Sequence, residues 1–298
     1  MLLQPYDLMS ETLYIIENHI TESITITELS GMLSISPIHL QRLFKFAFGI
    51  PLASYIRSRK LAVGARLLME TDYHIIDIAC ELGFTYEQTF IRAFKQEFGI
   101  TPSGLRKSGQ ILKITPPLQM FPHNRLSEGA LFGPDIVMVP EIHLIGHKSV
   151  VPFSQSVVVP PQLAKSFWFN DRIKIKGILE PDVYYGLTRI RDIKDGYSFY
   201  MPSVKVKKNA KIPCDLNKDV FPACSCVRFH YIGRHHYYEI NVDIARGMYD
   251  AIVEFANQEQ KRYHILNQEL YFERIDSADY DGTYCQMEWF TPIYPVES

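Results

Sequence analysis

Residues 36–48, SPIHLQRLFKFAF, have the pattern of a short amphipathic helix. Its apolar residues recur at i, i+3, i+4 and i+7 and share one face: Leu40, Leu43, Phe44 and Ala47. Ser36 suits the N-cap, and Pro37 suits the first helical position, where its missing N–H costs no hydrogen bond. The opposite face is polar, which indicates a helix that presents side chains to something outside the protein.

A second copy of this pattern lies fifty residues further along, at residues 85–98, TYEQTFIRAFKQEF, with Thr85 as its predicted N-cap. Its predicted buried face consists of Phe90, Ala93, Phe94 and Phe98. A shorter helix is predicted before each copy, at 25–33, where Thr25 and Glu28 form a capping box, and at 75–82. These shorter helices are offset by 49 residues, so the second turn is one residue longer. The sequence predicts two helix-turn-helix units.

The segment 52–69 is predicted as one helix that joins the two units. About 18 residues of helix span ~27 Å, and successive major grooves on one side of B-DNA lie ~34 Å apart. A rigid pair of units therefore suits double-stranded DNA, with the two second helices in adjacent major grooves.

The outward strips of the two second helices carry side chains that suit base edges. Arginine can pair with guanine, glutamine with adenine, and isoleucine can pack on a thymine methyl. The DNA-binding candidates are Ile38, Gln41, Arg42, Lys45, Glu87, Gln88, Ile91, Arg92 and Lys95. Glu87 fits least well, because a carboxylate repels phosphate unless it accepts from a cytosine amino group. The alternative is that both strips are ordinary solvated helix faces.

Composition fits a globular protein but does not identify a partner. The chain has 298 residues, 47% of them hydrophobic, and a net charge of -2. Basic residues are nevertheless concentrated locally, since residues 29–69 contain no acid and six basic residues: Arg42, Lys45, Arg57, Arg59, Lys60 and Arg66. Five cysteines without a framework spacing suit a reducing compartment. With neither a signal peptide pattern nor a membrane-spanning stretch, we expect a cytoplasmic protein without a membrane partner.

The chain changes character after residue 107. Residues 108–134 are rich in proline and glycine and are predicted as a linker between domains 1–107 and 135–298. Strands are predicted at 136–145, 183–190, 197–206, 225–232, 269–275 and 284–293, and helices at 162–170 and 242–258. This order predicts two βαββ halves. The expected fold class is therefore multidomain, an all-α domain followed by an α+β domain.

Glu288 lies within an otherwise apolar predicted strand, YCQMEWFTPI. Strand alternation places Glu288 with Phe290 on one face, and Met287 with Trp289 on the other. A carboxylate among aromatic residues is costly unless it has a partner, and a cationic ligand is one such partner. An exposed strand edge or a salt bridge is the alternative explanation.

The helical region resembles the AraC/XylS-type DNA-binding domain over about 100 residues. The resemblance rests on SPIHLQRLFKFAFGIPLASYIRSRKLAVGARLL and IIDIACELGFTYEQTFIRAFKQEFGITPSGLRK, which include the joining helix and the ending after Phe98. It implies a transcription regulator whose recognition helices begin after Ser36 and Thr85.

The second region is similar to the GyrI-like effector-binding domain, on its strand order and the ending EWFTP at residues 288–292. This resemblance implies a groove between the two halves for small molecules, often cationic and aromatic, with Glu288 as its acidic centre. The ligand-binding candidates are Glu288, Phe290, Tyr184, Trp168 and Tyr284.

The combined prediction is a sequence-specific, ligand-responsive transcription regulator without cofactor, metal or catalytic residues, with RNA polymerase as a further candidate partner. Zinc at Cys224 and Cys226 is disfavoured, because the C-x-C spacing lacks the usual C-x2-C knuckle. Two alternatives stay open. The second domain is a hydrolase that uses Glu288 as general base, or it mediates only protein contacts in a constitutive regulator.

Overall fold

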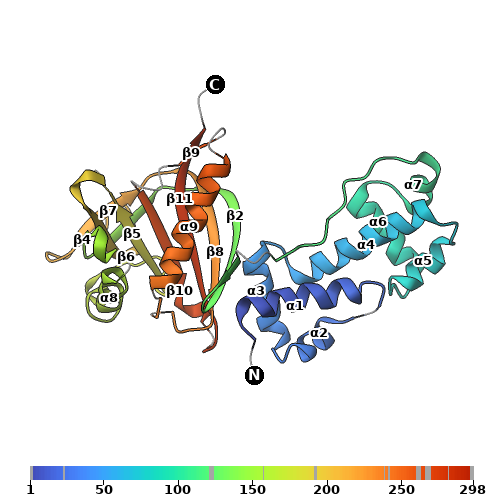
Figure 1. Ribbon diagram of the computed structural model, residues 1–298, viewed down its shortest axis with the longest axis horizontal. Coiled ribbons are helices and arrows are strands. Elements are labelled where there is room, and N and C mark those ends of the chain that lie inside the picture. Colours follow the sequence, from blue (N-terminus) through green and yellow to red (C-terminus); the bar gives the residue numbers. More distant parts are fainter. Residues whose placement is uncertain are drawn as a thin grey trace. The chain divides into compact units, whose positions relative to one another are not determined.

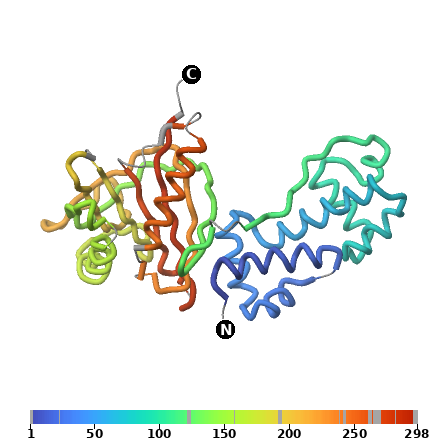
Figure 2. The backbone as a smooth tube through the Cα atoms, viewed as in Figure 1, coloured from blue at the N-terminus to red at the C-terminus, as the bar shows by residue number. Residues whose placement is uncertain are grey.

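A computed structural model describes residues 3–22, 24–120, 124–156, 158–190, 193–237, 239–240, 242–259, 263–265, 270–280 and 282–295. The chain divides into two compact units, Met1–Pro122 and His123–Ser298 (Figure 2). The division falls within residues 108–134, which the sequence indicates as the linker.

The first unit is helical throughout its regular elements (Figure 1). Its helices are α1 (Pro5–Asn18), α2 (Ile26–Met32), α3 (Pro37–Phe48), α4 (Leu52–Glu70), α5 (Ile75–Glu81), α6 (Glu87–Phe98) and α7 (Pro102–Ser108). The pairs α2–α3 and α5–α6 form the two predicted helix-turn-helix units, and α4 joins them.

The local signals that start these helices act as predicted, with one exception. Thr25 and Glu28 form a capping box at α2, and the Ser36 side chain accepts from the His39 backbone N–H at α3. Helix α6, by contrast, has Tyr86 at its N-cap and no side-chain cap hydrogen bond. The predicted cap at Thr85 is therefore wrong by one residue, and the second recognition helix begins without the hydrogen bond that stabilises the first.

Helix α4 contributes to the core of both helix-turn-helix units. The ring of its Tyr55 lies against that of Phe44 in α3, with centroids 5.5 Å apart. Its residues Leu61, Ala65 and Leu68 pack with Phe90 and Phe94 of α6 in one buried cluster. Polar groups of α4 also act internally: the Lys60 ammonium donates to the backbone carbonyls of Glu22 and Leu82, both at 2.9 Å. Lys60 therefore links the segment that follows α1 to the C-cap residue of α5.

An ion pair between α1 and α4 belongs to a group of hydrogen bonds that hold the segment after α7 against the helices. Arg59 donates through Nη2 to Glu17 Oε2 at 2.9 Å and through Nη1 to the Thr115 carbonyl at 2.7 Å. The Tyr55 hydroxyl donates to Glu17 and accepts from the Leu118 backbone N–H. The first part of the predicted linker is thus attached to the helical unit. Arg59 and Lys60 are buried, so they do not contribute to the exposed basic surface that the sequence indicates.

The second unit combines one large antiparallel sheet with two main helices (Figure 1). Its strands are β1 (Arg125–Leu126), β2 (Gly129–Val139), β3 (Ile142–Gly146), β4 (Ser149–Pro152), β5 (Val183–Arg189), β6 (Tyr197–Lys205), β7 (Asn217–Phe221), β8 (Cys224–Gly233), β9 (Tyr263–Ile265), β10 (Leu270–Asp276) and β11 (Cys285–Pro295). Its main helices are α8 (Val159–Ser166), continued by a π-helical turn at Phe167–Asp171, and α9 (Val242–Glu259).

The two predicted βαββ halves are present as β3-α8-β5-β6 and β8-α9-β10-β11. The order across the sheet is β1-β2-β8-β11-β10-β5-β6-β3-β7, so the halves meet where β10 pairs with β5. The single strand predicted at 136–145 is wrong. It is two strands separated at Pro140 and Glu141, of which β2 pairs with β8 and β3 pairs with β6 and β7.

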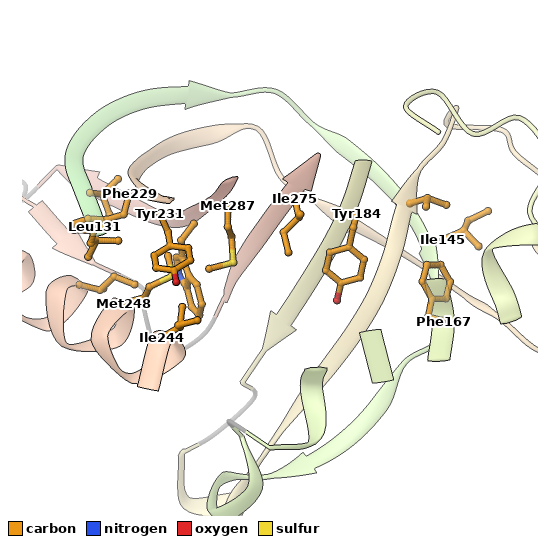
Figure 3. Packing of buried hydrophobic residues seen from close by; sticks show 14 of the residues in the cluster. Leu131, Ile145, Phe167, Tyr184, Phe229, Tyr231, Ile244, Met248, Ile275 and Met287 are labelled. Carbon is orange, nitrogen blue, oxygen red and sulfur yellow. The ribbon is translucent and has the colours of Figure 1, made fainter. Parts of the chain in front are cut away.

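The two faces of the sheet have different cores. The face covered by α8 and α9 carries Tyr184, Ile275 and Met287, which share a buried cluster with Phe167 and Met248 (Figure 3). The other face carries a second cluster, which includes Tyr185, Phe272 and Phe290. Strand alternation therefore decides which side chains are near the helices.

We expect Glu17→Gln to lower the free energy of unfolding at pH 7 by about 2 kcal/mol, because Arg59 loses a charge-assisted hydrogen-bond partner. Burial raises the pKa of Glu17, but hydrogen bonds from Arg59 and Tyr55 outweigh it and hold that pKa below its usual 4.5. The contribution is therefore present above pH 4.5 and is lost as the pH falls through the lowered pKa. Urea unfolding followed by circular dichroism between pH 3 and 7 measures this difference.

The matched control is Glu70→Gln, which removes an exposed pair with Arg66 at 3.9 Å. Such pairs contribute about 0 to 1 kcal/mol. Equal losses for the two variants, or a Glu17→Gln loss that does not decrease as the pH falls from 7 towards 3, contradict the role given to Glu17.

Candidate DNA-binding surface and ligand cavity

The DNA-binding candidates lie on the outer faces of α3 and α6. On α3, Ile38 is 81% exposed, Gln41 and Lys45 are exposed, and Arg42 is half-buried. On α6, the exposed candidates are Gln88, Arg92 and Lys95, and the half-buried ones are Glu87 and Ile91. Both helices thus combine a buried apolar side with an accessible strip of polar and basic side chains.

A pocket lies on the helix-covered face of the second unit, and both halves contribute to it. Residues of α8 and the following π-helical turn line one side, and strands β5, β6, β10 and β11 form the floor. Its aromatic lining residues are Trp168, Phe169, Tyr184, Tyr200, Tyr237, Tyr271 and Trp289. Such a wall suits a flat or multi-ring apolar ligand.

The aromatic side chains of the wall support one another. The rings of Tyr271 and Trp289 stack with centroids 4.7 Å apart. The Arg172 guanidinium lies over the Trp168 ring, 4.1 Å from its centroid, and donates to the Pro181 carbonyl. This contact shows a planar cation packed on the Trp168 ring, although Arg172 itself is not a lining residue of the pocket.

Glu273 of β10 places a carboxyl in this pocket. The Tyr200 hydroxyl donates to Glu273 Oε1 at 2.6 Å, and the Tyr184 and Tyr200 hydroxyls are hydrogen-bonded to each other. Protein atoms surround the carboxyl, and the residue as a whole is half-buried. Burial raises the pKa of Glu273 to about 7, and the hydrogen bond from Tyr200 lowers it only in part.

Gly186 of β5 makes room for this carboxyl. It is the register partner of Glu273 across the β5–β10 pair. A Cβ atom at Gly186 would lie 1.9 Å from Glu273 Oε1 and 2.6 Å from the Tyr200 hydroxyl oxygen. A side chain of any size at this position is therefore incompatible with the observed place of the carboxyl.

Glu288, expected as the acidic centre, lies elsewhere. Its two oxygens accept from Arg228 Nη1 and Arg274 Nη1, each at 3.1 Å, on the sheet face opposite the helices. It is not among the residues that line the pocket. The alternative that Glu288 forms a salt bridge is therefore the observed one, because two guanidinium groups balance the charge of its carboxylate.

The other ligand candidates are divided by position. Tyr184 and Trp168 line the pocket. Phe290 stacks on Phe272 in the core of the opposite face, with ring centroids 4.5 Å apart. Tyr284 is 1% exposed and is not a lining residue. Of the five candidates, the structure brings two together at the pocket.

Glu273 is not among the residues predicted from the sequence, although the pattern of its strand contains a signal for it. In β10, LYFERID, alternation puts Tyr271, Glu273 and Ile275 on one face. That pattern places an acid between two apolar residues on the helix-covered side. An acid at such a position is as unusual as Glu288 in its own strand. Only the register with β5, however, shows that a glycine faces it.

Two further expectations concern metal and membrane. Cys224 Sγ and Cys226 Sγ lie 3.8 Å apart and are buried. Within the residues that the structure covers, no group of three His, Cys, Asp or Glu side chains gathers in a way that suits a metal ion. The described helices include none with the length and hydropathy needed to cross a bilayer.

The fold and the pocket define a class: proteins that join a double helix-turn-helix unit to an α+β unit for small molecules. Residues 29–108 match the model of a helix-turn-helix domain, and residues 133–283 match that of the GyrI-like small molecule binding domain. The second match spans half of the chain, and the chain belongs to this GyrI-like family, in the variant with an N-terminal AraC-type helix-turn-helix domain.

Two relatives share parts of this plan. The right origin-binding protein of Escherichia coli (strain K12) is 31% identical over 184 residues, which cover 60% of this chain and 61% of that protein. The transcriptional regulator Rob of Salmonella typhimurium is 36% identical over 107 residues, 35% of this chain and 37% of the relative. The chain thus spans about three fifths, or less, of the length of these relatives.

A solved structure aligns with part of this chain. The C-terminal domain of the response regulator yesN from Fusobacterium nucleatum is 32% identical and aligns over 34% of this chain and 98% of that one, with a TM-score of 0.33.

We expect Gly186→Ala to push the Glu273 carboxyl away from Tyr200, because the added methyl group occupies the same space. Overpacking of this kind costs about 1–3 kcal/mol, which thermal unfolding of the full chain detects. Gly31→Ala is the control, since a Cβ there meets nothing within 4 Å. Unchanged stability of Gly186→Ala contradicts the close approach.

Proposed function

We propose that this protein is a transcription regulator that binds specific DNA through α3 and α6 and a small aromatic cation in the pocket of its second unit. The observation that carries the proposal is the pairing of a recessed carboxyl, Glu273, with an aromatic wall, in a chain that also holds two helix-turn-helix units.

The DNA-binding part of the proposal rests on the exposed strips. Arg42 and Arg92 occupy the same position in the two repeats, and Gln41 and Gln88 are accessible beside them. Guanidinium groups select guanine through paired hydrogen bonds, and amides select adenine. The two helices therefore act as two readers on adjacent major grooves of one DNA duplex.

The ligand-binding part rests on charge and shape. Glu273 lacks the two guanidinium partners that Glu288 has, and aromatic faces surround it. A cationic aromatic ligand gives this carboxyl a counter-charge and stacks on the wall at the same time. Tyr184 and Trp168 contact the ligand directly, whereas Glu288, Phe290 and Tyr284 support the sheet beneath it.

Regulation requires that the ligand bind two states of the protein with different affinity. We propose that effector binding changes how the protein engages DNA or RNA polymerase. The relatives described above include a named transcriptional regulator, which favours binding over catalysis. If the pocket only binds, mass spectrometry recovers a bound ligand unchanged after prolonged incubation; turnover instead supports the hydrolase alternative.

We expect Arg42→Ala to lower affinity and sequence preference more than Arg92→Ala does. The first helix has a side-chain cap and no acid among its outward candidates, whereas α6 lacks the cap and carries Glu87. Loss of a bidentate contact to guanine costs about 1–3 kcal/mol at one base pair. Binding of the full chain to a selected DNA site and its single-base variants measures both effects, and equal losses contradict the ranking.

We expect Glu273→Gln to weaken binding of a permanent aromatic cation at pH 8 by at least about tenfold, the equivalent of one charge-assisted contact of ~1.4 kcal/mol or more. Glu288→Gln is the matched control on the opposite face, and it lowers stability without changing cation affinity. Isothermal titration of methyltriphenylphosphonium into each full-length variant measures this. Equal affinities for Glu273→Gln and the wild-type chain contradict the proposed role.

A further inference from the structure

The partners of Glu273 are neutral. The Tyr200 hydroxyl of β6 donates to its carboxyl, and the Tyr184 hydroxyl of β5 is hydrogen-bonded to the Tyr200 hydroxyl. Among the described residues, no basic side chain forms an ion pair with Glu273 within 4.0 Å. The other titratable groups of the lining are the hydroxyls of Tyr237 and Tyr271 and the ammonium of Lys165. No histidine belongs to the described lining.

This environment disfavours the charged form of the carboxyl in the empty pocket. A hydroxyl compensates a carboxylate only partly, and removal from water penalises the charge. The pKa of Glu273 is raised to about 7 by that burial. Close to neutral pH, the empty pocket therefore contains both the carboxylic acid and the carboxylate.

We propose that Glu273 exchanges its proton for a cationic ligand, so that the pocket takes aromatic cations above neutral pH and neutral aromatic ligands with a hydrogen-bond acceptor below it. This inference rests on the proposed ligand-binding function. In the exchange, the O–H bond of the carboxylic acid breaks, the proton passes to solvent, and the cation supplies the counter-charge that the pocket lacks.

The second half of the proposal follows from the donor that the acid provides. A protonated carboxyl donates one hydrogen bond, while the carboxylate only accepts. A neutral ligand with a polarised oxygen therefore gains a donor when Glu273 is protonated and faces a repulsive oxygen pair when it is not. The two ligand classes must respond to pH with opposite signs.

The experiment compares two probes of nearly equal shape, methyltriphenylphosphonium and triphenylphosphine oxide, by isothermal titration with the full chain between pH 6 and 8. Cation affinity falls about tenfold from pH 8 to pH 6, since the ionised fraction falls from about 0.9 to about 0.1. Titration in buffers of different ionisation enthalpy detects about 0.9 proton released per cation at pH 6 and about 0.1 at pH 8. The affinity of the phosphine oxide changes in the opposite direction.

Two variants separate this exchange from a general effect of pH on the fold. Glu273→Gln removes the pH dependence of both probes. Tyr200→Phe removes the hydroxyl that favours the carboxylate, so the midpoint of the cation profile moves to higher pH. Tyr185→Phe is the control, because Tyr185 lies on the opposite face of the same part of the sheet and its hydroxyl donates to Glu180; its profile keeps the wild-type midpoint.

The outcomes are distinguishable. Cation binding with the same affinity at pH 6 and pH 8, and no proton release, overturns the exchange and leaves the proposed effector class intact. Cation binding that is absent at every pH, with the protein folded, overturns both. Opposite slopes for the two probes that disappear in Glu273→Gln support the exchange.

Discussion

Successive side chains of a strand point to opposite faces of a sheet, and this constraint sorts the charges of the second unit. Glu273 and Glu288 lie on neighbouring strands, β10 and β11, but Glu288 is the register partner of Arg274 whereas Glu273 is that of Trp289. One acid therefore meets arginines on one face, and the other meets aromatic rings and tyrosine hydroxyls on the helix-covered face. Arg274 and Glu273 are adjacent in β10 and therefore point to opposite faces. On one face the acid forms an ion pair that stabilises the sheet, and on the other the carboxyl is available to a ligand.

Much of the fold follows from local signals in the sequence. The repeat at 36–48 and 85–98 and its apolar spacing predict both helix-turn-helix units, the cap at Ser36 is observed, and α4 extends over the predicted segment. The strands that were not predicted from the sequence, such as β4 and β7, are short. The break at Pro140 that separates β2 from β3 was also not predicted. Such elements form because a distant strand supplies hydrogen bonds, and the periodicity of a few residues does not contain that information.

The pocket was less accessible to prediction for the same reason. Trp168 and Tyr184 belong to aromatic clusters that are visible in the sequence. The role of Gly186 depends on its pairing with Glu273, 87 positions away in the chain, and on Tyr200 from a third strand. The alternation in β11 correctly separated Glu288 from Trp289, but it did not show which of the two faces holds the pocket.

The internal use of Arg59 and Lys60 has a consequence for ionic strength. Two of the six basic residues between 29 and 69 are buried, with hydrogen bonds to Glu17, Thr115, Glu22 and Leu82. Each phosphate that a protein neutralises on B-DNA adds about 0.9 to the slope of log affinity against log salt concentration, because counterions are released. The buried side chains of Arg59 and Lys60 neutralise no phosphate and so release no counterions from DNA. A DNA complex of this chain therefore tolerates salt better than the local count of lysine and arginine implies.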